Sequence, residues 1–126
     1  PRSRIPEMVR WIDDLRQRTG LQMVTFGHAG DGNIHFNIML DENDPAALNK
    51  AEQAVEALFR QAVKLGGTIS GEHGIGITKA PYLSMELGEE EIALMTRIKA
   101  AFDPKGILNP GKIFTDGFGA VSLHGQ

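Results

Sequence analysis

The segment Thr25–Asn37, with the sequence TFGHAGDGNIHFN, decides how the first half of the chain folds. Asp31–Gly32 separates two segments in which apolar and polar residues alternate, an arrangement typical of a β-hairpin. The chain has four histidines among its 126 residues, and two of them, His28 and His35, flank this turn. The question is whether these histidines belong only to a tight turn or hold a metal ion.

The geometry of a two-residue loop at Asp31–Gly32 predicts which residues face each other. His28 would lie opposite His35, and Phe26 opposite Asn37, with opposed Cβ atoms about 4.5–5.5 Å apart. Two imidazoles in this position can share one ion, because metal–nitrogen bonds are about 2.0–2.1 Å long. A surface turn with two solvated histidines is the alternative. The face suited to a core would carry Ile34, Phe36, Ile38 and Leu40.

The composition is that of one globular domain, with 41% apolar and 23% charged residues. The net charge is -3 at pH 7 and no basic run occurs, so the usual footprint of nucleic-acid binding is absent. Because the chain has no cysteine, disulfides and thiol catalysis are excluded, and nitrogen and oxygen must supply any metal ligands.

No transmembrane segment is predicted, because no apolar run approaches the roughly 18 residues that a membrane helix needs. No signal peptide is visible either. We expect a cytoplasmic protein, and peripheral association of the intact protein with a membrane stays open. The chain begins at Pro1 rather than Met, and we expect it to be part of a longer protein.

A second cluster of chemically useful residues lies in Gly71–Gly76, GEHGIG, where the third histidine, His73, follows Glu72. The glycine spacing differs from the dinucleotide-binding fingerprint, and the Lys-Ser/Thr of a P-loop is missing. These glycines indicate unusual backbone angles or close approach to a partner. In an extended chain Glu72 would face the hairpin while His73 points to another part of the same pocket. A Gly-rich turn with a solvated Glu-His pair is the alternative.

Taken together, the two clusters predict a metal site. His28, His35 and Glu72 would form a set of two histidines and one carboxylate, with positions left open for water or substrate. His73 would then remain as a base. A ligand set with open positions favours catalysis over structural support.

The rest of the chain predicts an α+β fold with an antiparallel sheet covered by helices on one face. Residues 103–114 indicate a series of turns, in which Asp103–Gly106 suits a type I turn, and residues 115–126 are expected to be a disordered tail. The predicted elements are helices at about 6–19, 46–65, 81–87 and 89–102, and strands at 21–28, 33–40 and 68–70.

Three motifs, GHAGDGNIH (27–35), GEHGIG (71–76) and AFDPKGILNPGKIF (101–114), resemble the C-terminal domain of the FAD-linked oxidases of the vanillyl-alcohol-oxidase type. The opening PRSRIPEMV resembles the same family, and the likeness covers nearly the whole chain to Phe114. The branch it resembles is the group of the glycolate oxidase flavoprotein subunit, D-lactate dehydrogenase and D-2-hydroxyglutarate dehydrogenase.

The resemblance implies a ferredoxin-like α+β fold for residues 1–114, as part of the substrate or cap domain, with 115–126 outside it. It also implies an upstream domain that binds most of the FAD. The activity would be the oxidation of a small 2-hydroxy acid to the 2-oxo acid, with hydride passing to FAD. We expect this fragment to be inactive alone.

The resemblance also assigns roles to individual residues. A divalent ion, zinc or manganese, would be held by the residues already singled out, His73 would be the general base, Asn37 would lie at the substrate and Asn109 near the flavin. The arginine and lysine that bind substrate in this family usually precede the matched region, so carboxylate recognition stays undetermined. Lesser candidates for the pocket are Arg2, Arg4, Lys79 and Tyr82, for which packing or solvation of the surface is the alternative.

Two other classes of function stay open. The same ligands would serve a metal-dependent hydrolase, in which water is activated and no flavin is needed. They would also serve a non-catalytic module that binds metal or contacts another protein. The sequence leaves open which 2-hydroxy acid is used, which electron acceptor or partner subunit takes part, and whether a homodimer forms.

Overall fold

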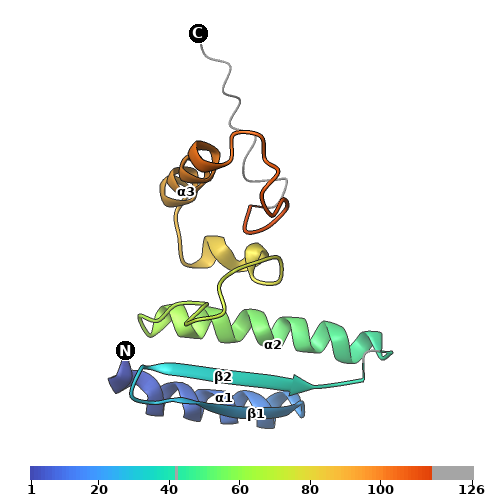
Figure 1. Cartoon of the computed structure of the whole chain (residues 1–126). Coiled ribbons are helices and arrows are strands. Elements are labelled where there is room, and N and C mark those ends of the chain that lie inside the picture. The colour runs from blue at the N-terminus through green and yellow to red at the C-terminus, as the bar shows by residue number, and fades with distance from the viewer. Residues whose placement is uncertain (42, 115–126) are drawn as a thin grey trace. The chain divides into compact units, whose positions relative to one another are not determined.

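The computed structural model describes residues 1–41 and 43–114, and the chain divides into two compact units that meet between Gly71 and Glu72. The α-helices and the hairpin strands begin and end within one residue of their predicted bounds. The first unit contains the 3-10 helix η1 (Arg2–Arg4), α1 (Ile5–Thr19), β1 (Gln22–His28), β2 (Asn33–Met39) and α2 (Pro45–Lys64), and the second contains the 3-10 helix η2 (Ala80–Met85) and α3 (Glu89–Phe102) (Figure 1).

The two long helices have clear end signals in the sequence. Gly20 ends α1 in the left-handed conformation (φ 67°), and its N–H donates to the Arg16 carbonyl. Asp44 caps the start of α2, because its carboxylate accepts the N–H groups of Ala46 and Ala47 at 2.9 and 3.2 Å. These local signals explain why the boundaries of the helices are readable without tertiary information.

The hairpin is confirmed, but the predicted register is wrong by two residues. In the structure His28 lies opposite Asn33, and Phe26 lies opposite His35. The connection is Ala29–Gly32 rather than two residues, and the Asp31 N–H donates to the His28 carbonyl at 2.9 Å. Gly30 gives a strand no side chain to pack, which favours the longer turn. Because side chains alternate with period two, the even shift leaves both histidines on the same face.

The two faces of the hairpin differ in burial. Met23 is buried on the inner face of the hairpin, and the half-buried Ile34, Phe36 and Ile38 lie on the same face. The strand β1 contacts α1. The outer face exposes Val24, Phe26 and Met39 at 46, 54 and 53%. The buried apolar residues of the first unit are Met8, Ile12, Leu15, Leu21, Met23, Ala51, Ala54, Leu58, Phe59 and Ile69.

The chain leaves α2 through a Schellman turn. Gly66 is left-handed (φ 75°), its N–H donates to Val63, and the Gly67 N–H donates to Ala62. The strand predicted at 68–70 is wrong, because the described residues contain a sheet of β1 and β2 only. The Ser70 N–H contacts the Thr68 hydroxyl at 3.4 Å, and the segment is anchored by the buried Ile69 instead of a strand ladder.

In the second unit the turn-rich segment after α3 is organised by one carboxylate. Asp103 is 7% exposed and accepts the Lys99 ammonium at 2.6 Å and the N–H groups of Ile107 and Leu108 at 3.0 and 2.9 Å. The Gly106 N–H donates to the Asp103 carbonyl, which confirms a turn at 103–106. The ammonium lowers the pKa of the Asp103 carboxyl below its usual value, with a smaller contribution from the two N–H groups.

The architecture is therefore mixed α+β, with a two-stranded antiparallel sheet. Among the described residues, no helix combines the length and apolar character that a membrane span requires. The tail predicted at 115–126 lies outside the described residues.

Candidate metal centre

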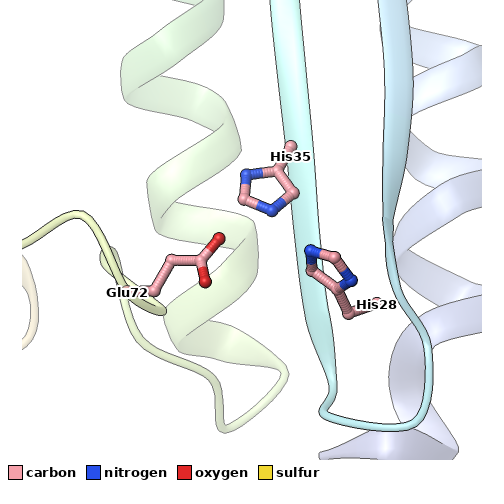
Figure 2. Close-up of side chains that lie close together, drawn as sticks. All are labelled: His28, His35 and Glu72. Atoms are coloured by element: carbon pink, nitrogen blue, oxygen red, sulfur yellow. The ribbon is translucent and has the colours of Figure 1, made fainter.

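Three donor side chains meet at the turn end of the hairpin. His28 ends β1, His35 lies on β2, and Glu72 directly follows Gly71, the last residue of the first unit. One ligand atom from each of the three lies within 4.8 Å of the others. Figure 2 shows both imidazoles on the same side of the strands, with the Glu72 carboxylate beside them. The structure thus brings together the three residues that the sequence predicted as ligands.

The two imidazoles are diagonal neighbours rather than opposed residues. Their ring centroids are 5.5 Å apart and the rings are nearly perpendicular, at 86°. The His35 ring also stacks on Phe26, with centroids 5.1 Å apart and an angle of 19°. This stacking follows from the true register, which places Phe26 opposite His35. An aromatic neighbour of this kind restricts the orientation of the His35 ring.

The donor set fits a borderline divalent cation. Two imidazole nitrogens and one carboxylate oxygen suit zinc or manganese, and the set leaves coordination positions for other molecules. Ligands about 2.1 Å from a tetrahedral ion lie roughly 3.4 Å from one another, so the present spacing needs only small side-chain rotations. His28 and Glu72 are exposed and His35 is half-buried, so these rotations are open to at least two of the three.

His73 lies close to Glu72 instead of pointing away from it. The chain bends at residues 71–73, and His73 Nε2 is 3.5 Å from Glu72 Oε1. The extended conformation predicted for this segment is therefore wrong, and the left-handed Gly74 (φ 75°) accounts for part of the bend. The His73 side chain is 71% exposed, so it is accessible to a substrate as well as to Glu72.

The other predicted site residues are divided between the two units. Asn37 is exposed on β2, two residues beyond His35 and on the same face. Asn109 lies in the turns after α3 with φ 49°, a left-handed conformation that asparagine tolerates. Lys79 is half-buried, and this burial lowers the pKa of its ammonium.

The two N-terminal arginines both make contacts within the first unit. The Arg2 guanidinium donates to the Gly30 carbonyl of the hairpin loop at 3.4 Å, and Arg4 pairs with Glu7 at 2.9 Å. The pair with Glu7 agrees with the prediction that Arg4 serves the surface of α1. Arg2 instead supports the loop whose length was mispredicted.

Residues 1–113 match the family model described as FAD linked oxidases, C-terminal domain. The chain belongs to this family. It is 50% identical over 114 residues to the glycolate oxidase subunit GlcD of Bacillus subtilis, an alignment that covers 90% of this chain and 24% of the relative. It is 43% identical over 113 residues to a D-lactate dehydrogenase of Archaeoglobus fulgidus (90% and 25%). It is 40% identical over 120 residues to a D-2-hydroxyglutarate dehydrogenase of Stutzerimonas stutzeri (89% and 25%).

The chain spans about a quarter of the length of these relatives. Family membership was predicted from the three motifs and is confirmed. Two contributors to the region were missed in the sequence. Both were missed because the predicted register was wrong: Phe26 lies opposite His35 and Asn33 opposite His28.

Proposed function

We propose that this chain is the C-terminal part of an FAD-dependent dehydrogenase or oxidase that converts a small 2-hydroxy acid, of the glycolate or D-lactate type, to the 2-oxo acid. The observation that carries the proposal is the group formed by His28, His35 and Glu72 on the exposed face of the hairpin. Family membership and the names of the relatives support the same chemistry. Because the relatives are about four times as long, we propose that most of the FAD site lies outside this chain.

Each residue has a role in this proposal. His28, His35 and Glu72 would hold a zinc or manganese ion, and Asn37 would bind the substrate from the same face. His73 would accept the hydroxyl proton, since histidine is the side chain that most often exchanges protons near neutral pH. Asn109 would lie at the flavin. When bound, the cation would supply polarisation of the substrate hydroxyl, and the flavin would supply an acceptor for the hydride of the α-carbon.

The atoms balance without a further reactant. The α-carbon loses a hydride and the hydroxyl loses a proton, so the C–O single bond becomes a carbonyl. Val24 and Phe26 are exposed on the same face of the hairpin as His28 and His35. If another part of the protein covered these two side chains, it would exclude water from the reacting atoms. We further propose that the two-stranded sheet belongs to a ferredoxin-like fold, as the family resemblance implies.

The test is the metal content of the purified chain, measured by mass spectrometry after incubation with Zn²⁺ or Mn²⁺ and desalting. We expect about one equivalent in the parent and little in His28→Ala and Glu72→Ala. Glu52→Ala, which removes an exposed carboxylate of α2, is the matched control and should keep the metal. Equal metal content in all four proteins would contradict the proposed site.

Flavin dependence separates the proposal from a metal-dependent hydrolase. In a protein that carries this chain together with its flavin-binding part, bound FAD should be bleached by D-lactate or glycolate. Hydrolysis by the same metal site in a protein that binds no FAD would favour the hydrolase.

A further inference from the structure

Glu72 lacks a regular secondary structure to hold it, which raises the question of what fixes its distance from the two histidines. His28 and His35 are placed by the hairpin ladder, but residues 71–73 form a bend outside any helix or strand. The last buried side chain before Glu72 is that of Ile69, three residues upstream. Something between Ile69 and Glu72 must therefore limit the position of the chain.

Gly71 packs directly against the side chain of Asn33. A Cβ atom added to Gly71 would lie 2.5 Å from Asn33 Oδ1, 3.0 Å from its Cγ and 3.4 Å from its Nδ2. The three nearest atoms thus all belong to this one side chain. A side chain at this position would therefore displace the Asn33 amide, and Gly71 does not have the positive φ that would require glycine for backbone reasons.

Asn33 also has a central place among the donors. It is the cross-strand partner of His28, and it lies two residues before His35 on the same face of β2. Its side chain therefore separates the hairpin from the residue that immediately precedes Glu72. Shortening or displacing this side chain changes the distance between the carboxylate and the two imidazoles.

We propose that Asn33 and Gly71 form a positioning contact that sets the Glu72 carboxylate at coordinating distance from His28 and His35. The inference rests on the proposed metal site and adds residues that do not themselves bind the ion. Supports of this kind around a metal site typically contribute 10–100-fold to metal affinity.

The experiment titrates the full chain with Co²⁺ alone and follows the visible absorption of the bound ion, which reports the number and geometry of its ligands. Asn33→Ala and Gly71→Ala should each weaken the binding of Co²⁺ by about 10–100-fold. The visible absorption of the bound ion should also be less intense in each variant than in the parent. Gly30→Ala is the matched glycine control, because a Cβ at Gly30 meets nothing within 4 Å. Its affinity should equal that of the parent.

Repeating both substitutions in a Glu72→Ala background isolates the mechanism. If Asn33 and Gly71 act through Glu72, they should have no further effect on affinity once the carboxylate is gone. A loss of equal size in that background would overturn the proposal, because it would show a general loosening of the hairpin. Parent-like affinity of Asn33→Ala and Gly71→Ala would overturn it as well.

Failure of the underlying site would look different. If the parent itself does not bind Co²⁺, the proposed metal site is contradicted, and this proposal with it. If the parent binds and only the positioning variants keep full affinity, the metal site stands and the positioning contact is overturned.

Discussion

The group formed by His28, His35 and Glu72 and the turn around Asp103 both contain titratable side chains, but the first is largely exposed and the second is buried. Asp103 is almost completely buried, and its carboxylate is saturated by one ammonium and two backbone N–H groups. His28 and Glu72 are exposed, on or beside a sheet face that also exposes Val24 and Phe26. A carboxylate surrounded by protein donors stabilises the fold, whereas exposed donors that converge remain available to a ligand.

The two regions should differ most in how far a substitution lowers the affinity for Zn²⁺. His35→Ala should lower the affinity for Zn²⁺ by more than about 100-fold, since it removes a direct ligand rather than a supporting group. Asp103→Ala should change the affinity by no more than about twofold. Both are measured by competition with a zinc chelator, and a large loss in Asp103→Ala would show that the two regions are coupled.

The same two substitutions should have the reverse effects on the local stability of the turn around Asp103. Asp103→Ala removes the acceptor of the Ile107 and Leu108 N–H groups, and we expect these two amides to exchange with solvent about tenfold faster or more. Hydrogen exchange followed by NMR measures this directly. His35→Ala should leave the two rates unchanged, and parent-like exchange in Asp103→Ala would contradict the organising role of the carboxylate.

Low pH should destabilise the turn after α3 by protonating the Asp103 carboxylate. The Lys99 ammonium lowers the pKa of Asp103 in the folded chain, so the folded state binds fewer protons than the unfolded state. The stabilisation is therefore complete above the ordinary aspartate pKa of about 3.9 and is lost as the pH falls through and below that value.

The measurement is exchange of the Leu108 amide, corrected for its intrinsic pH dependence, from neutral pH down to about pH 2.5. Protection should fall in the parent and be low and flat in Asp103→Asn. A parent profile without an acid transition would contradict the assignment.

The smallest effect comes from an ion pair of the same sequence spacing on an exposed surface. Arg60 and Glu56 lie 2.7 Å apart on α2, with side chains 64 and 45% exposed. Glu56→Gln should lower the free energy of unfolding by only about 0.3–0.5 kcal/mol, because water screens the pair. Urea unfolding measures the change. A loss of more than about 1 kcal/mol would mean that spacing, and not exposure, determines the contribution of such pairs.

The predictions from sequence succeeded where the signal is local. The bounds of the α-helices, the hairpin around Asp31–Gly32 and the turn at Asp103 all depend on residues near in sequence. The convergence of His28, His35 and Glu72 was also predicted, because alternation along a strand fixes the face even when the register is wrong by two. These residues were predicted as a group, and their roles remain proposals.

The failures involve distances in space. The loop of four residues, the missing strand at 68–70 and the bend that brings His73 to Glu72 were not predicted. Each of these features depends on which residues a segment packs against, and a pattern of neighbouring residues does not reveal them. The stacking of Phe26 on His35 and the approach of Gly71 to Asn33 have the same origin.

Local patterns were enough to predict the helices, the hairpin and the face on which the histidines lie, since periodicity and turn chemistry act over a few residues, and three motifs were enough to indicate the family. The register, the distance of Glu72 from the imidazoles and the burial of Asp103 could be read only from the folded chain. These features depend on close packing between segments far apart in the chain, where a shift of one or two ångströms changes which atoms meet.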